Sequence, residues 1–199
     1  MAERIGILGG TFDPPHVGHL WLAETARDQL GLDQVLFIPV GEPPHKPKSG
    51  LTAVAHRLAM TKLAIDPNDD FALDVSDIDR PPPHTTVTLL PIVQANYPQA
   101  NLWLLLGADS LRDFTSWAGP GKIIQQCRLA VLGRPQAKID WQELETAVPD
   151  IHRAVDYLSG PTTNISSTDI RNWVHDGHSL KYIVPEEVDS YIKKNQLYI

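Results

Sequence analysis

The feature that most constrains the fold is a glycine pair that joins an apolar run to a helical pattern near the N-terminus. Residues 5–8 indicate a buried strand, and Gly9 and Gly10 follow it directly. Glycine has no Cβ, so the backbone at this point can approach a ligand closely. From about His16 an apolar residue recurs every four positions until Gly31, a helix stop signal. The segment therefore predicts a strand, a turn and a helix, an arrangement typical of phosphate binding at a helix N-terminus.

Two histidines lie in the first turn of this predicted helix. His16 and His19 are three positions apart and share one face, where unpaired backbone N–H groups and the positive end of the helix dipole favour an anion. A zinc pair and a purely structural pair are the alternatives, but the single cysteine, Cys127, is distant and no third ligand has a zinc-site spacing. The segment matches neither the P-loop nor the dinucleotide-binding pattern. Phosphate binding is favoured, and no residue is predicted to be a metal ligand.

Length, composition and charge limit the remaining possibilities. With 199 residues, of which 42% are hydrophobic and 21% charged, the chain is expected to form one domain over 1–199, with a C-terminal helical part at about 165–199. The net charge of -7 argues against a nucleic-acid partner. No apolar run approaches the ~20 residues that span a bilayer, and no signal-type segment is present. With one cysteine, the expected location is the cytoplasm. The oligomeric state stays open, a homo-oligomer included.

Strand and helix patterns alternate along the chain. This alternation predicts an α/β fold, Rossmann-like, with a mainly parallel sheet and helices on both faces. The expected strands are 5–8, 35–40, 71–78, 102–106 and 128–132. The expected helices are 16–30, one that Thr52 caps and that reaches 63, 85–96, one after Ser166, and 185–195. Residues 136–151 carry no chemistry that the pattern reveals.

Candidate ligand-binding loops follow several of these strands. Ligands bind outside the carboxyl ends of parallel strands, so one crevice is expected to collect Gly9 to His19, Pro43 to Lys46, Gly107 to Asp109, and Arg134. Prolines around His45 and Lys46 stiffen that loop and favour a placed cation over a solvated charge. Asp109 either caps a turn or meets a ligand. Trp117 is either core or a platform for a planar ligand.

A second anion site is expected near residue 166. Ser166 and Asp169 form a capping-box-like helix start, and Arg171 lies off the apolar stripe of that helix. Capping alone would explain the serines. Together with the histidines of the first helix, this N-terminus offers a second site for a polyphosphate.

These motifs resemble those of the nucleotidyltransferase superfamily with the H-x-G-H signature, and within it the bacterial nicotinate-nucleotide adenylyltransferases. The resemblance covers almost the whole chain. It lies in Gly9 to His19, Pro43-Pro44-His45-Lys46, Gly107 to Trp117, Arg134-Pro135 and Ile165 to Arg171. One segment departs from the family pattern, because Pro82-Pro83-His84-Thr85 stands where the family typically has Pro-Ser-Tyr-Thr.

The resemblance implies adenylyl transfer from ATP to nicotinate mononucleotide with Mg²⁺, giving nicotinate adenine dinucleotide and pyrophosphate in NAD biosynthesis. It implies His16, His19, Lys46 and Arg171 as catalytic residues. It implies as substrate-binding residues Gly9, Gly10, Thr11, Phe12, Asp13, His45, His84, Thr85, Gly107, Asp109, Trp117, Arg134, Ser166, Ser167 and Thr168. The open alternatives are preference for nicotinamide mononucleotide, a phosphopantetheine- or cytidylyl-transferring enzyme, and a non-catalytic nucleotide sensor.

The departing loop bears on the choice of mononucleotide. A carboxylate accepts from two donors, whereas a carboxamide sets its own NH₂ against one of them. The backbone N–H groups of His84 and Thr85 are expected to be these donors, and a protonated His84 would add to them. The acid is therefore the expected substrate, with a smaller margin than in members that keep the usual loop.

Overall fold

Six parallel strands in the described part of the chain form one sheet in the order β3-β2-β1-β4-β5-β6. The computed structural model describes residues 2–41, 50–133 and 139–199. The strands are β1 (Arg4–Gly10), β2 (Gln34–Pro39), β3 (Phe71–Leu73), β4 (Asn101–Gly107), β5 (Arg128–Leu132) and β6 (Val155–Leu158). Every described strand pair is parallel, which confirms the predicted Rossmann-like class. Three predicted site residues, His45, Lys46 and Arg134, lie outside the described residues.

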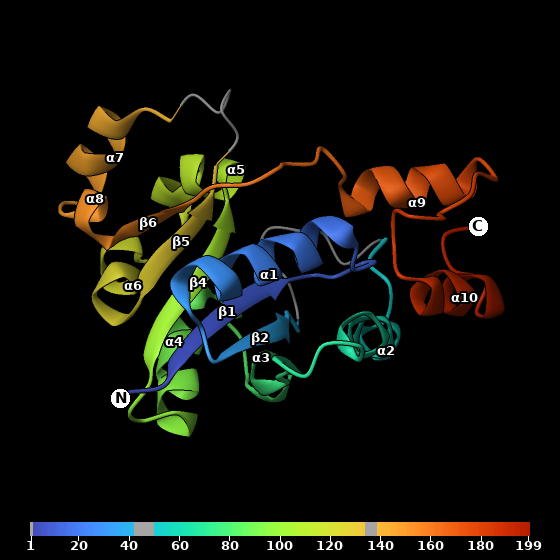
Figure 1. The fold of residues 1–199 in the computed structure, drawn as a ribbon, viewed down its shortest axis with the longest axis horizontal. Coiled ribbons are helices and arrows are strands. Elements are labelled where there is room, and N and C mark those ends of the chain that lie inside the picture. Colours follow the sequence, from blue (N-terminus) through green and yellow to red (C-terminus); the bar gives the residue numbers. More distant parts are fainter. Residues whose placement is uncertain (1, 42–49, 134–138) are drawn as a thin grey trace.

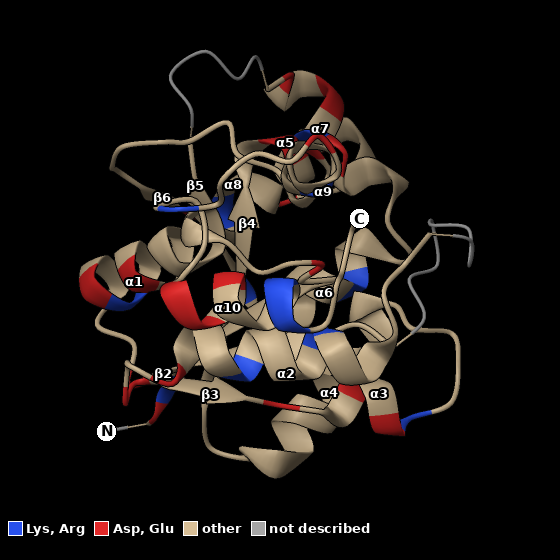
Figure 2. Ribbon diagram, turned by 90° about the vertical axis from the view of Figure 1, so that its right-hand side faces the viewer, with Lys and Arg blue, Asp and Glu red and all other residues tan. Residues whose placement is uncertain are grey.

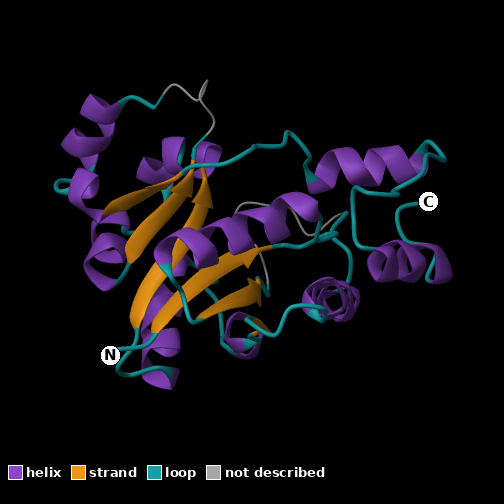
Figure 3. Ribbon diagram, in the orientation of Figure 1, coloured by secondary structure: helices purple, strands orange, loops and turns teal. Residues whose placement is uncertain are grey.

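Helices cover both faces of the sheet (Figures 1 and 3). They are α1 (Val17–Leu30), α2 (Val54–Ile65), α3 (Ser76–Asp79), α4 (Thr86–Asn96), α5 (Ala108–Arg112), α6 (Pro120–Gln126), α7 (Trp141–Ala147), α8 (Ile151–Ala154), α9 (Ser167–His175) and α10 (Glu186–Lys194), with a 3₁₀ turn at Phe114–Ser116. No helix in the described part of the chain is long and apolar enough to cross a membrane.

Strand side chains alternate between two cores. Ile7, Leu104 and their neighbours on one face pack with α4 and α6. Phe37, Leu105 and their neighbours on the other face pack with α1. Central strands buried on both faces are apolar at every position, because successive side chains enter opposite cores. This is why 102–106 reads as a continuous apolar run.

Helix α1 begins and ends where the sequence indicates. His16 is its N-cap residue, with extended backbone angles. Gly31 closes it with φ 58°, a left-handed conformation that glycine adopts without Cβ strain. The predicted helices at 85–96 and 185–195 are also present, as α4 and α10.

Two local predictions are wrong. The expected strand 71–78 stops at Leu73, because the Asp74 carboxylate accepts from the Ser76 N–H at 2.7 Å and turns the chain into α3. Thr52 does not cap α2, whose N-cap is Ala53 without a side-chain hydrogen bond. The Thr52 N–H instead donates to the carboxylate of Asp13, at 3.2 Å.

The C-terminal helices form a third core beside α2. Ile170, Val188 and Ile192 pack with Met60 of α2. In Figure 1, α9 and α10 lie at one end of the molecule and α7 and α8 at the other. Figure 2 shows the acidic first turn and basic last turn of α10, a distribution that complements the helix dipole.

Strand β6 was not predicted, and one carboxylate ties it to the sheet. Asp156 accepts from Arg128 on β5, at 2.6 and 2.7 Å, and from the Trp103 indole on β4, at 2.9 Å. The hydrogen bonds from Arg128 hold the pKa of Asp156 below its ordinary value. Because the folded-state pKa is lowered, this stabilisation is present above the unfolded value of 3.8 and is lost as pH falls through the folded one.

We therefore expect Asp156→Asn to lower the free energy of unfolding by about 1–2 kcal/mol at pH 7, the scale of partly exposed hydrogen bonds to a charged group. Urea unfolding measures it. The difference from the wild type should shrink as pH falls below the unfolded value of 3.8 towards the lower folded-state pKa, where the native carboxylate protonates. Asp69→Asn, at an exposed position, is the control. Equal losses in the two variants would contradict the assignment.

Candidate active site

The carboxyl ends of β1 and β4 bound an open crevice at the centre of the sheet. These strands are neighbours, and the chain continues outward in opposite directions from them. A Cβ added to Gly9 or Gly107, at the two strand ends, would meet no atom within 4 Å. Crossover points of this kind are where open parallel sheets bind ligands. The predicted site residues Gly9, Gly10, Thr11 and Gly107 therefore meet in one place.

His16 and His19 form a capping box at the start of α1. The Nδ1 atom of His16 accepts from the Gly18 N–H at 3.1 Å, and that of His19 accepts from the His16 N–H at 3.2 Å. Because each Nδ1 is an acceptor, the proton of each neutral imidazole is on Nε2. Within the described residues, no hydrogen bond uses either Nε2 atom. Helix capping thus leaves two N–H donors free for a ligand.

Burial keeps both imidazoles neutral. It lowers the pKa of His16 from 6.5 to about 4. The pKa of His19 lies well below 6.5, through burial first and then the nearby His16. The two rings are 3.8 Å apart between centroids, so a second positive charge would be costly there. In the ligand-free protein at neutral pH, the two histidines therefore offer N–H donors but carry no positive charge.

Gly18 is required by the size of the His16 ring. A Cβ at this position would lie 3.0 Å from Cε1 and Nδ1 of His16 and 3.1 Å from the Thr163 methyl. Real Cβ atoms rarely come so close, so a larger residue would push the imidazole away. The sequence predictions did not assign a role to this residue, although it lies between the two histidines.

The N-terminus of α9 docks against the loop between β1 and α1. The Arg171 guanidinium donates to the Asp13 carbonyl at 2.7 Å, and the Ser167 hydroxyl donates to the Pro14 carbonyl at 2.9 Å. Ser166 caps α9 by accepting from the Asp169 N–H, as predicted. The two predicted anion-binding motifs are therefore adjacent in the structure.

Phe12 and Asp13 have buried side chains. Both are 0% exposed. The Phe12 ring packs edge-on against His19 at 5.0 Å, and its φ of 48° is unusual for a residue other than glycine. The Asp13 carboxylate is hydrogen-bonded to the Thr52 N–H and the Tyr198 hydroxyl. Ring packing by Phe12 and hydrogen bonds to Asp13 therefore hold the loop in place.

A cavity of about 390 Å³ extends from the crevice between β1, β4 and α4. It is lined by Gly9, Gly10, Thr11, Ile38, Val40, Asp77, His84, Thr85, Thr86, Leu89, Leu104, Leu105, Leu106, Trp117, Ala118 and Ile123. Most of these are apolar, with a few polar groups at the α4 end, the usual composition of a small-molecule site. Trp117 and the departing loop are thus in the same cavity, whereas Asp109 is exposed and paired with Arg112 at 2.9 Å.

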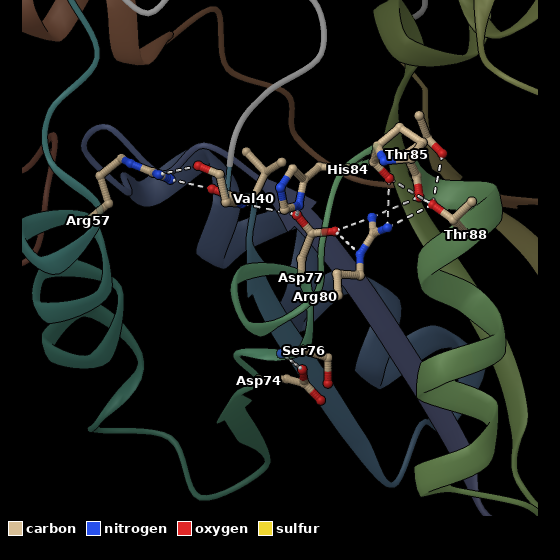
Figure 4. Close-up of polar contacts among 11 residues, drawn as sticks. Val40, Arg57, Asp74, Ser76, Asp77, Arg80, His84, Thr85 and Thr88 are labelled. Atoms are coloured by element: carbon tan, nitrogen blue, oxygen red, sulfur yellow. Dashed lines mark hydrogen bonds and ion pairs between the residues drawn. The ribbon is translucent and has the colours of Figure 1, made fainter.

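Arg57, which the sequence predictions missed, holds three segments around this cavity, and Figure 4 shows its contact with Val40. It is 1% exposed. Its guanidinium donates at 2.8–3.1 Å to the carbonyl oxygens of Thr11, Val40, Gly41 and Thr52. A charged residue on the buried stripe of α2 was the available signal.

Asp77 and Arg80, also missed, hold the departing loop (Figure 4). Arg80 donates to the Asp77 carboxylate and to the Pro83 and Thr85 carbonyls. The Asp77 carboxylate lies 3.2 Å from Nδ1 of His84. The expected Thr85 donor is wrong, because the Thr85 N–H already donates to the Pro83 carbonyl at 3.0 Å.

The described residues contain no group of three or more His, Cys, Asp or Glu side chains suited to hold a metal ion. The carboxylate nearest to the histidines in sequence, that of Asp13, is buried and occupied by two donors. This donor set does not fit a resident metal site.

Comparison with known proteins identifies the family. Residues 7–173 match the cytidylyltransferase-like family model. A probable nicotinate-nucleotide adenylyltransferase of Thermomicrobium roseum is 42% identical over 98% of this chain and 92% of its own length. The corresponding protein of Roseiflexus sp. (strain RS-1) is 43% identical over 98% and 97%. The chain belongs to the nicotinate-nucleotide adenylyltransferase family.

Solved structures agree with this fold. Plasmodium falciparum nicotinic acid mononucleotide adenylyltransferase complexed with NaAD superposes with a TM-score of 0.80, covering 98% of this chain and 97% of the other, at 20% identity. The same Plasmodium protein complexed with APC gives 0.78. As in other adenylyltransferases of this family, the chain is a nucleotidyltransferase.

We expect nuclear magnetic resonance of the ¹⁵N-labelled imidazoles to show both histidines neutral and protonated at Nε2 at pH 7. The His16 signals should stay constant from pH 8 to 5.5, because burial lowers its pKa to about 4. Gly18→Ala should shift the His16 signals by displacing its ring from the Gly18 N–H. Gly121→Ala, where a Cβ meets no atom within 4 Å, should leave them unchanged. An Nδ1-protonated His16 in the wild type would refute this geometry.

Proposed function

We propose that this protein transfers the adenylyl group of ATP to nicotinate mononucleotide, releasing pyrophosphate, as a step of NAD biosynthesis. The observation that carries the proposal is the juxtaposition of a histidine capping box, the α9 N-terminus and an apolar cavity at one sheet edge. The first two suit polyphosphate, and the third suits a planar ring. The names of the relatives support the same reaction.

The reaction needs positioning and charge stabilisation. A phosphate oxygen of the mononucleotide attacks the α-phosphorus of ATP, a new P–O bond forms, and the bond to the β-phosphate bridge breaks as pyrophosphate leaves. The attacking oxygen is already anionic, so no protein base is required. The protein must hold two repelling anions in line and stabilise charge on the transferring group.

His16 and His19 fit this role because their rings are close together and each keeps an Nε2–H group that helix capping does not use. Backbone hydrogen bonds hold both rings, so little reorganisation is needed when charge develops. A bound polyphosphate would favour the protonated imidazole and could add a charge that the ligand-free site lacks. We assign the two donors to the ATP phosphates and the transition state.

The remaining assignments follow from position. Arg171, docked beside the loop at the α9 N-terminus, is assigned with Ser167 to the outer phosphates. Asp109, exposed beside β4, is assigned to a ribose, and Trp117, in the cavity wall, to the pyridine. Lys46 and Arg134 stay predicted phosphate contacts, and His45 stays a predicted substrate-binding residue.

The family's divalent cation, which we propose to be Mg²⁺, enters as Mg·ATP. The donor set of the described residues does not fit a resident ion. Mg²⁺ keeps several waters and commonly binds substrate phosphates, which agrees with this proposal. We further propose that the protein acts as one domain in the cytoplasm, on these small molecules and not on nucleic acid.

The groups at the α4 end of the cavity lead us to expect preference for nicotinate mononucleotide over nicotinamide mononucleotide. Thr86 lines the cavity at the start of α4, where the N–H groups of Thr86 and Val87 have no intrahelical acceptor. These donors take the role that the sequence analysis gave to the Thr85 N–H. Nicotinate can accept from them with both oxygens, whereas an amide sets its own NH₂ against a donor.

The test is pyrophosphate release from ATP with nicotinate mononucleotide, nicotinamide mononucleotide or phosphopantetheine as acceptor. We expect kcat/KM for the acid to exceed that for the amide by about 10- to 100-fold, the effect of one mispaired buried polar group. Measurements at pH 6 and pH 8 show whether the margin holds across this range. Preference for the amide at both pH values would make nicotinamide mononucleotide the substrate. Binding without release would indicate a nucleotide sensor.

His16→Ala and His19→Ala should each lower kcat by about 10²–10³-fold, the usual cost of removing one preorganised transition-state donor. Steady-state kinetics at saturating ATP measure this effect. His175→Ala, at an exposed position near the end of α9, is the control and should keep wild-type turnover. Near-normal turnover in both site variants would remove the histidines from the mechanism.

A further inference from the structure

The penultimate residue of the chain contacts the loop that leads to the catalytic histidines. The Tyr198 hydroxyl donates to the Asp13 carboxylate at 2.7 Å, across 185 positions of sequence. Burial raises the pKa of this hydroxyl, with a further contribution from Asp13, so it remains a proton donor at physiological pH. Nothing in the proposed reaction assigns a role to this contact.

We propose that Tyr198 is a positioning residue of the active site, whose hydroxyl fixes the Asp13 carboxylate and thereby the loop that leads to His16 and that anchors Arg171 of α9 beside ATP. This inference rests on the proposed function, because it takes the ATP phosphates to bind at that loop.

Asp13 connects the two sides of the site. One carboxylate oxygen accepts from Tyr198 and the other from the Thr52 N–H at 3.2 Å. The main-chain carbonyl of the same residue accepts from Arg171 at 2.7 Å. Asp13 is 0% exposed, so water cannot readily replace a lost donor. Removing the hydroxyl would therefore move the residue that holds Arg171.

The end of the chain is held in an unfavourable conformation to make this contact. Gln196 and Tyr198 have φ values of 50° and 68°, in the left-handed region that non-glycine residues rarely adopt. Such strain persists only where surrounding contacts determine it. The Tyr198 ring packs in the core that α2 shares with α9 and α10, and its hydroxyl lies 3.8 Å from the Met60 sulfur. The ring supplies packing, and the hydroxyl alone reaches the loop.

The chain offers a matched control in Tyr191 of α10. Its hydroxyl lies 2.9 Å from Nδ1 of His56, in the same C-terminal core, and contacts no residue of the loop. Tyr198→Phe and Tyr191→Phe each remove one partly buried phenolic hydroxyl and leave the ring. The experiment measures melting temperature, kcat, both KM values, and the affinity for a non-hydrolysable ATP analogue by calorimetry in the two full-length variants.

We expect Tyr198→Phe to lower kcat/KM for ATP by about tenfold and to weaken the analogue similarly, with KM for the mononucleotide changed less than about twofold. Tyr191→Phe should keep wild-type kinetics at a comparable melting temperature. Asp13→Ala should reproduce the ATP defect, and adding Tyr198→Phe to it should cost little more, because the alanine variant already lacks the acceptor of the Tyr198 hydroxyl.

Equal kinetics and analogue affinity in the two tyrosine variants would overturn the inference, because the hydroxyl would then only stabilise the fold. An equal rise in the KM for ATP and the KM for the mononucleotide in Tyr198→Phe would overturn it too, since the effect would not be specific to the ATP side. If the wild type releases no pyrophosphate with any acceptor, the proposed function fails. The analogue affinity of the two variants would still decide the role of Tyr198.

Discussion

The site depends on how the loop between β1 and α1 is held. Three of its carbonyl oxygens accept hydrogen bonds from side chains of distant segments: Thr11 from Arg57, Asp13 from Arg171 and Pro14 from Ser167. Buried backbone outside helices and strands cannot pair its own carbonyl groups. These side-chain donors therefore allow the irregular loop before the histidines to be buried. Two of the three donors are guanidinium groups, whose several N–H groups can reach more than one carbonyl.

This support explains how a short motif can act as a rigid site. His16 and His19 hydrogen-bond the first N–H groups of α1 and become fixed in doing so. Their Nε2–H groups remain for a ligand, and burial keeps both rings neutral. In the proposed function, the site would thus attract phosphate by directed donors before it carries extra charge. In an acidic protein with net charge -7, local donors of this kind must supply the attraction.

The cavity has a comparable division between lining and support. Trp117, Leu104 and the glycines of β1 form its walls. Arg57 and Arg80 are not part of the lining; Arg57 binds backbone carbonyl oxygens, and Arg80 binds a carbonyl oxygen and the carboxylate of Asp77, which itself lines the cavity. Buried charges of this type are costly to leave unpaired, so they constrain the loops strongly. Lys46 and Arg134, whose positive side chains are predicted to contact phosphates, lie outside the described residues.

Local sequence patterns were enough to predict the parallel fold and the closeness of two helix starts, which remain predicted anion sites. Strand and helix periodicity are local, and the carboxyl ends of parallel strands must meet at one edge. Tertiary structure decided which groups are free. A loop N–H such as that of Thr85 looks available in sequence, but the fold had already paired it with Pro83. Arg57 and Tyr198 reach the loop only because helices and chain end pack beside it, and no local pattern encodes contacts across 46 or 185 positions.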